Sequence, residues 1–198
     1  MPTQFHISNV DGHRELRLLS EDGTNRLTFD LVRNLTDALQ SLRAHARPLI
    51  IHGSETFFSA GADLFEIQAL DASGAFVFAK AGQKLMNAVA HFPAPVYAAI
   101  RGYCMGGGLD LALACHRRIA SPNAVFGHRG AALGLVTGWG GTQRLPRLVG
   151  KPTALAMFVA AEKLHASQAR SIGLVDAIAE DPIAEASRRI EQLSAQLP

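Results

Sequence analysis

Two glycine-rich segments carry the residues best suited to chemistry. One is RGYCMGGGLD (101–110) and the other is GSETFFSAGADL (53–64). Each follows a short apolar run and precedes a helical pattern, so glycines stand where a helix begins. Free backbone N–H groups and the helix dipole both favour negative charge at that end of a helix. Together the two segments can offer donors to one developing oxyanion. Close packing of helix on strand is the alternative interpretation of the glycines.

The same segments resemble the signature loops of a known family. FFSAGADL (57–64) and RGYCMGGGLDLALAC (101–115) are similar to those of the enoyl-CoA hydratase/isomerase family, also called the crotonase family. Phe126-Gly127 and TGWGGTQRL (137–145) follow in the family order, and the resemblance runs from about Glu15 to Leu197. Several motifs in one order are far more specific than a single glycine run.

The resemblance implies a fold and an assembly. The expected fold is α/β, a ClpP/crotonase-type spiral of ββα units, forming a single domain over residues 1–198 that lacks most of the usual C-terminal helical region. The resemblance also implies a homo-oligomer, either a trimer or a dimer of trimers. Without the helical lid, we expect the acyl pocket to be open, to be completed by a neighbouring subunit, or to be served by a different protein.

The resemblance assigns the acyl-CoA ligand to particular residues. The backbone N–H groups of Ala62 and Gly107 are expected to hold the thioester carbonyl and to stabilise an enolate. The implied CoA-binding residues are Asn25, Arg26, Ala60, Ala62, Asp63, Leu64, Tyr103, Gly106 and Gly107. Thr56 stands where a basic residue often contacts the CoA phosphates, and Arg26 is the candidate replacement. Coenzyme A arrives with the substrate, so no separate cofactor is expected.

The acid/base positions depart from the family pattern. Asp110 stands where family hydratases have a glutamate, and Gly130 stands where the FGxPE pattern supplies a second one. His128, beside Arg129, is a candidate for the missing proton transfer. A surface or interface role is the alternative for His128. Trp139 lies in a turn where the family has small residues, and it is expected either to line the acyl pocket or to form a subunit contact.

Three functions are compatible with these residues. The first is an active hydratase/isomerase-type enzyme of fatty acid metabolism, acting on an unsaturated or β-substituted acyl-CoA with Asp110 as its acid/base. The second is a decarboxylase or carbon–carbon lyase of the same fold, with His128 or Tyr103 supplying the proton. The third is a non-catalytic CoA-binding or scaffold subunit, which Thr56, Gly130 and the short C-terminal region suggest.

Composition argues against several other classes. Nineteen basic and seventeen acidic residues give a formal charge of +2 without a long basic run, so we expect no nucleic acid partner. No apolar run is long enough to span a membrane, and two cysteines without a signal-like N-terminus indicate a cytoplasmic protein. The eight histidines lack ligand spacing, so no metal site is predicted.

The elements that position these loops alternate between strand and helix. Strands are predicted over 15–19, 49–52, 96–100, 118–120 and 175–178, and helices over 28–46, 71–92, 141–148, after Pro152 and over 184–196. Thr28 is the expected N-cap of the first helix. Strand, loop and helix in alternation predict a parallel sheet.

Overall fold

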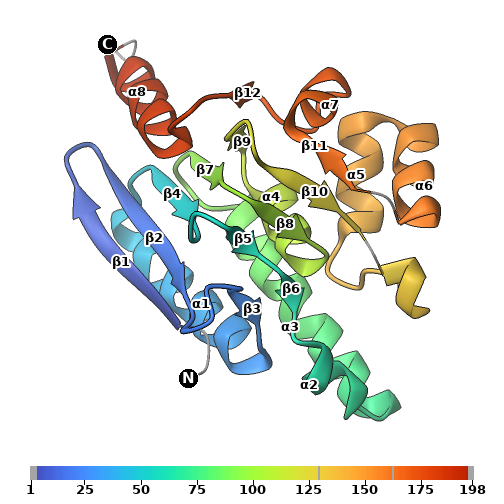
Figure 1. Ribbon diagram of the computed structural model, residues 1–198. Helices are drawn as coiled ribbons and strands as arrows, with labels where there is room; N and C mark the ends of the chain where they lie inside the picture. The colour runs from blue at the N-terminus through green and yellow to red at the C-terminus, as the bar shows by residue number, and fades with distance from the viewer. Residues whose placement is uncertain (1–3, 129, 162, 196–198) are drawn as a thin grey trace.

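A six-stranded sheet forms the centre of the molecule (Figure 1). The computed structural model describes residues 4–128, 130–161 and 163–195. In spatial order the strands are β1 (Gln4–Val10), β2 (His13–Leu19), β4 (Leu49–His52), β7 (Val96–Ile100), β9 (Arg117–Ala120) and β12 (Ala177–Ile178). β1 and β2 pair antiparallel as a hairpin, and all the other neighbours pair parallel.

A smaller four-stranded sheet lies beside the first, and it carries the loops predicted to do chemistry. Its spatial order is β11 (Leu164–His165), β10 (Val125–Gly127), β8 (Tyr103–Met105) and β5 (Phe57–Ser59). β3 (Arg26–Leu27) and β6 (Gly61–Ala62) form a separate parallel pair. β5, β8 and β10 pair parallel, with a register shift between Phe57 and Ser59 of β5, so their carboxyl ends lie at one edge.

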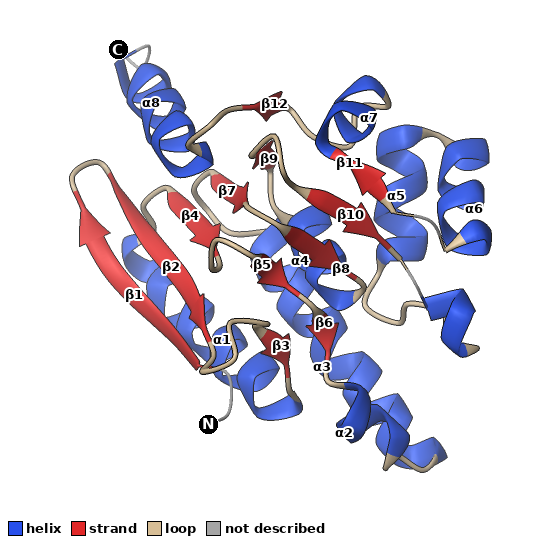
Figure 2. Ribbon diagram, in the orientation of Figure 1, coloured by secondary structure: helices blue, strands red, loops and turns tan. Residues whose placement is uncertain are grey.

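The chain winds through the two sheets in repeated turns. β4 leads into β5, β7 into β8 and β9 into β10, and a helix follows each of these pairs. This is the spiral of ββα units expected from the resemblance. Figure 2 shows the helices arranged around the strands. They are α1 (Phe29–Leu42), α2 (Leu64–Gln68), α3 (Ala72–Ala90), α4 (Gly107–Ala114), α5 (Gly141–Val149), α6 (Lys151–Ala160), α7 (Ala166–Ser171) and α8 (Pro182–Ala195), with 3-10 turns η1 (Arg43–His45) and η2 (Gly130–Leu133).

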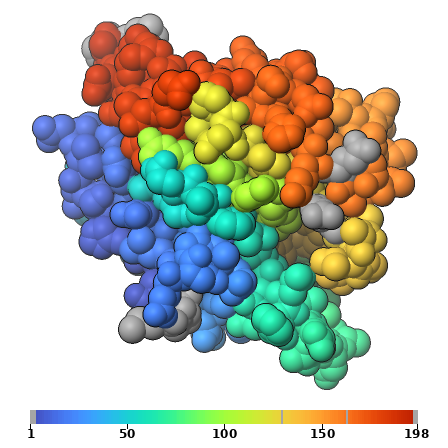
Figure 3. Space-filling view, in the orientation of Figure 1, coloured from blue at the N-terminus to red at the C-terminus, as the bar shows by residue number. Residues whose placement is uncertain are grey.

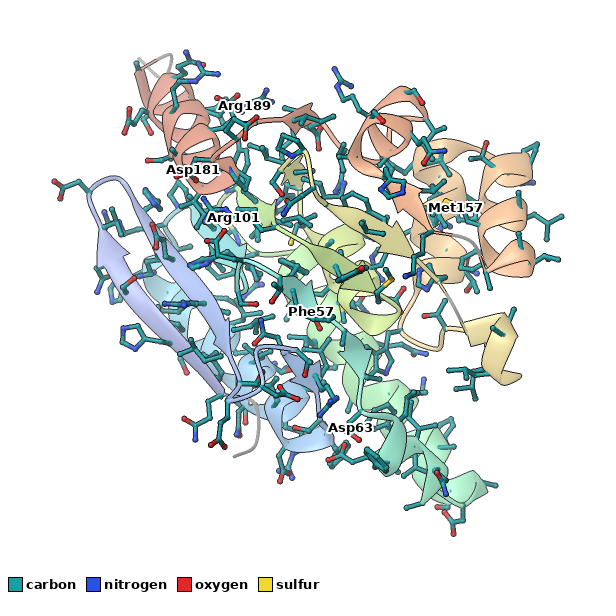
Figure 4. All side chains as sticks on the ribbon, viewed as in Figure 1. Phe57, Asp63, Arg101, Met157, Asp181 and Arg189 are labelled. Atoms are coloured by element: carbon teal, nitrogen blue, oxygen red, sulfur yellow. The ribbon has the colours of Figure 1, made fainter. Side chains whose placement is uncertain are left out.

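Alternation along the central strands divides the core into two layers. Leu49 and Ile51 of β4 face the larger cluster, which includes side chains of α1, α3 and α4, whereas Ile50 packs with Ile190 of α8. Successive side chains of a strand point to opposite faces, so a strand buried on both faces is apolar throughout. Arg101 after β7 forms an ion pair of 2.8 Å with Asp181 just before α8, and both are labelled in Figure 4.

Several predicted element bounds need correction. The first helix ends at Leu42 rather than near residue 46, because the chain tightens into η1 before Pro48 leads into β4. The last predicted strand is only Ala177–Ile178, and the sheet is not wholly parallel because β1 is antiparallel to β2. The Thr28 cap is confirmed, since its side chain accepts the N–H of Leu31. Gln196, in the predicted last helix, lies outside the described residues.

Candidate functional site

Two backbone N–H groups lie side by side where α4 begins. Gly107 is the first residue of α4, so its N–H has no acceptor one turn back within that helix. The amide nitrogen of Ala62, at the end of β6, lies 3.2 Å from the position that a Cβ on Gly107 would occupy. Both residues line one cavity. Both nitrogens thus lie close together at the positive end of a helix, which is where the resemblance expects the two oxyanion donors.

Glycine at positions 61 and 106 makes this arrangement possible. Gly61 has a φ of +93°, and a Cβ there would lie 2.6 Å from the carbonyl oxygen of Met105 and 2.9 Å from the amide nitrogen of Gly107. Gly106 has a φ of +51° and a ψ of −119° as the chain turns from β8 into α4. Residues with a Cβ rarely adopt such backbone angles. Gly61 therefore allows the close approach of the two loops, and Gly106 allows the turn from β8 into α4.

The donors face a largely apolar cavity of about 580 Å³. Its walls come from residues 60–67 and the start of α3 on one side, and from residues 130–139 on the other. In Figure 3 the surface is recessed between the green segment of α2 and α3 and the gold segment around η2. Asp110, His128 and Thr137 bring side-chain polar groups to this cavity, whereas most of its other lining residues are Ala, Leu, Val, Ile or Phe. Such a pocket suits an apolar group with one polar reacting end.

Asp110 lies one turn into α4, with its side chain 1% exposed. The hydroxyl of Thr137 donates to its Oδ2. Burial raises the pKa of the Asp110 carboxyl to about 7, because desolvation outweighs the Thr137 hydrogen bond, the Arg144 cation and the Gly141 N–H, all of which favour the charged form. A carboxyl with this pKa exchanges a proton readily near neutral pH.

His128 lies directly beside this carboxyl. Its Nε2 is 3.4 Å from Asp110 Oδ1, and both atoms are buried without a hydrogen-bond partner among the described residues. Burial lowers the pKa of the His128 imidazole to about 4, so the ring is neutral at pH 7. Its ring also packs on Phe158, with the centroids 5.1 Å apart. The surface role considered for His128 is wrong because the ring is buried, and Arg129 lies outside the described residues.

At position 130, where the family pattern has its second glutamate, the backbone leaves no room for a side chain. Gly130 begins η2 and lines the cavity, but a Cβ on it would lie 2.6 Å from the carbonyl oxygen of Leu135. No carboxyl can be introduced there without a shift of this loop. Three groups favour the charged form of Asp110 but were not recognised from sequence, namely the Thr137 hydroxyl, the Gly141 N–H and the Arg144 cation. Their signal was their position within the TGWGGTQRL motif.

The predicted CoA-binding residues fall into two groups. Ala60, Ala62, Leu64, Gly106 and Gly107 line the cavity, and Leu64 is 50% exposed at its mouth. The other four residues make contacts within the chain. Asn25 is buried and donates from Nδ2 to the carbonyl of Phe57, and Arg26 is half-exposed and pairs with Asp22 at 3.1 Å. Asp63 caps α2 by accepting from the N–H groups of Phe65 and Glu66, whereas Tyr103 is exposed, with the Lys163 ammonium 5.1 Å from its ring centre. Asp63 is labelled in Figure 4.

Within 4–128, 130–161 and 163–195, no group of three or more His, Cys, Asp or Glu side chains is placed to hold a metal ion. Over the same ranges, no helix is both long and apolar enough to cross a membrane.

Comparisons with known proteins agree with this geometry. The family model for enoyl-CoA hydratase/isomerase matches residues 15–198. A probable enoyl-CoA hydratase of Bacillus subtilis is 40% identical over 175 residues, which cover 87% of this chain and 67% of that protein. The fatty acid oxidation complex subunit alpha of Shewanella halifaxensis is 39% identical over 184 residues, covering 89% of this chain and 26% of that protein.

Solved structures give the same result for the fold. The structure of Pseudomonas aeruginosa DspI has a TM-score of 0.93 at 31% identity, covering 98% of this chain and 76% of that one. Enoyl-CoA hydratase from Bacillus anthracis has a TM-score of 0.91 at 30% identity, covering 97% of this chain and 77% of that one. With a family model matching nearly the whole sequence and a shared fold, this chain belongs to the enoyl-CoA hydratase/isomerase family.

Proposed function

We propose that this protein catalyses proton transfer on an unsaturated acyl-CoA, with an enolate held by the N–H groups of Ala62 and Gly107 and with Asp110 as acid and base. The observation that carries the proposal is the buried Asp110 carboxyl. It has a pKa of about 7 and lines the same cavity as the two N–H groups. A group with a pKa near the working pH is effective both in accepting and in returning a proton.

A double-bond shift needs only one group that accepts and returns a proton. The Asp110 carboxylate takes a proton from Cα of a 3-enoyl thioester, and the electron pair moves to give a dienolate whose oxygen accepts from the two N–H groups. The same carboxyl then returns the proton to Cγ, which leaves a 2-enoyl thioester with the same atoms. The site therefore supports isomerisation with one carboxyl and two backbone donors.

Hydration of a 2-enoyl thioester demands more, because a water must be oriented while a proton is delivered to Cα. The second carboxylate of the hydratase pattern is replaced by Gly130, so the nearest further proton acceptor is the neutral imidazole of His128. We assign His128 the role of a positioning residue that shares a proton with Asp110 across the 3.4 Å between them. Isomerisation is accordingly proposed as the faster of the two reactions.

The cavity also bears on the decarboxylase alternative. Decarboxylation of a malonyl-type thioester needs recognition of a second carboxylate, and cations are the usual partners of buried carboxylates. None of the residues that line the cavity within the described part of the chain is Lys or Arg. The apolar lining supports a hydrocarbon acyl group instead.

The test separates enolate formation from the later steps. Exchange of the α-protons of butyryl-CoA in D₂O reports enolate formation alone, and conversions of 3-hexenoyl-CoA and crotonyl-CoA report isomerisation and hydration. We expect Asp110→Asn to lower exchange by about 10²–10⁴-fold, the usual contribution of a general base. Asp11→Asn, an exposed change in the turn between β1 and β2, is the matched control. Undiminished exchange in Asp110→Asn would show that another group is the base, and binding of butyryl-CoA without exchange in the wild type would favour a non-catalytic CoA-binding role.

A further inference from the structure

Trp139 occupies a central position between two helices. It is only 4% exposed, and its Nε1 donates to the carbonyl of Phe78 in α3 at 3.3 Å. Its ring also packs against the Phe78 ring, with the centroids 5.2 Å apart. The subunit contact considered from sequence is therefore wrong, because the indole is buried within its own chain. It nevertheless lines the cavity that contains the paired N–H groups.

Two glycines make room for this indole. A Cβ on Gly82, in the middle of α3, would lie 2.1 Å from Cδ1 and Nε1 of Trp139. A Cβ on Gly107 would lie 2.5 Å from Cζ3, on the opposite edge of the same ring. Glycine inside a helix costs about 1 kcal/mol relative to alanine, so its presence at position 82 calls for a packing reason. The indole spans the space between these two glycines.

The ring therefore lies next to the place where the thioester would react. The Gly107 position that touches Cζ3 is also 3.2 Å from the amide nitrogen of Ala62. A carbonyl oxygen held by both N–H groups places the α-carbon only two bonds away from that oxygen, and so in the neighbourhood of this edge of the indole. The indole has little room to move, because the Phe78 ring packs on it and the space beside Gly82 and Gly107 is too small even for a Cβ.

We infer that Trp139 is a specificity-determining residue that closes the pocket beside the α-carbon and restricts the acyl group to an unbranched hydrocarbon at that carbon. The inference rests on the proposed acyl-CoA ligand and adds to it the shape of the acyl group. An extra methyl group against a close-packed wall must displace packed atoms, whereas a linear chain continues into the apolar cavity between α2, α3 and the 130–139 segment.

A binding experiment tests this inference without requiring turnover. Calorimetry would compare butyryl-CoA with 2-methylbutyryl-CoA, which has the same main chain and one extra methyl group at the α-carbon. We expect the wild type to bind butyryl-CoA at least about tenfold more tightly, since one methylene is worth about 10–200-fold in a fitted pocket. Trp139→Leu and, as a second variant that retains a ring, Trp139→Phe should reduce this ratio. Phe76→Leu, which changes an exposed aromatic ring of α3 that does not line the cavity, should leave the ratio unchanged.

Fluorescence gives a measurement that depends on no variant. Trp139 is the only tryptophan in the sequence, so its emission reports on this wall alone. Butyryl-CoA should change the emission more than free CoA does. Equal binding of the two acyl-CoAs by the wild type, or a ratio that persists in both Trp139 variants, would overturn the inference and leave the proposed function standing. If neither acyl-CoA binds, both are wrong, whereas selective binding without α-proton exchange contradicts the proposed function alone.

Discussion

At the scale of single residues, the main feature is a pair of buried groups, Asp110 and His128, that are both mainly neutral between about pH 4 and pH 7. The Asp110 carboxyl has its pKa raised from 3.8 to about 7, and the His128 imidazole has its pKa lowered from 6.5 to about 4. Burial is the leading cause of both shifts, since a charged group in a low-dielectric site loses its hydration. A neutral acid beside a neutral base can share one proton without forming a buried ion pair.

The two pKa shifts have opposite effects on how the free energy of unfolding depends on pH, and this gives a prediction. Between about pH 4 and pH 6.5, the folded pair holds its proton on Asp110, whereas the unfolded chain holds one on His128 instead. The proton counts are equal, so the pair adds little pH dependence to the free energy of unfolding. Asp110→Asn leaves only the histidine, for which the unfolded state binds more protons, and stability should then rise with pH. His128→Gln leaves only the carboxyl, for which the folded state binds more protons, and stability should fall as pH rises.

Urea unfolding at half-unit intervals across this range measures both slopes. Each variant should depart from the wild type by up to about 1.4 kcal/mol per pH unit, in opposite directions. Two variants with slopes of the same sign would contradict the assignment of a neutral acid beside a neutral base.

At the scale of elements, the sequence predicted what repeating patterns determine. β4 and β7 were predicted with the bounds that the structure has, because buried parallel strands are continuous apolar runs between clear breaks. β5, β6 and β8 were not predicted as strands, because two or three residues are too few for a pattern. Yet these short strands carry the donor loops. Their position was available only through the resemblance, since β5 pairs with β8 across more than forty residues of chain.

The candidate site was predictable to a similar extent. The resemblance alone assigned Ala62, Gly107 and Asp110, and all three line one cavity. The hydroxyl of Thr137 and the packing of Trp139 on Gly82 were not predictable. They depend on side chains from separate helices and loops, and no local period encodes such contacts. A helix-interior glycine is a weak signal in sequence, because it has several explanations.

The fit of α3 to the indole gives a second prediction, in which the effect of one substitution on stability has opposite signs in the wild type and in a Trp139 variant. Gly82→Ala should destabilise the wild type by about 1–3 kcal/mol, because the new methyl group would overlap Trp139. In Trp139→Leu, the same change should stabilise by about 0.5–1 kcal/mol, because the clash is relieved and alanine is the better helix former. A double-mutant cycle from denaturant unfolding gives the coupling. Equal effects of Gly82→Ala in both backgrounds would mean that the indole does not determine this glycine.

At the scale of the whole molecule, α4 connects the reaction centre to the C-terminal part of the chain. Its first residue is Gly107, and the side chain of Arg118, which belongs to β9, lies at its C-terminal end. The Arg118 guanidinium donates to the carbonyl of Cys115 at 2.8 Å and, through Nε, to that of Leu174 at 2.9 Å, and its Nη2 lies 3.3 Å from Asp176 Oδ2. A cation at the C-terminal end of a helix is favoured by the helix dipole. This one buried side chain therefore links the position of α4 to the segment that leads into β12 and α8.

Breaking that link gives the third prediction, and the chain supplies its own control. Arg118→Met keeps an apolar stem but leaves buried carbonyls without their donor and removes the guanidinium from Asp176, so we expect the free energy of unfolding to fall by about 3–5 kcal/mol, as for other broken buried ion pairs. Arg117→Met removes a neighbouring cation that is 59% exposed and 3.7 Å from the same Asp176, and such surface pairs are worth about 0–1 kcal/mol. Urea midpoints of the two variants measure the difference. Because α4 also presents Gly107 and Asp110, any folded Arg118→Met protein should bind butyryl-CoA more weakly than Arg117→Met does. Equal midpoints and equal binding would show that α4 is held in place by its apolar contacts alone.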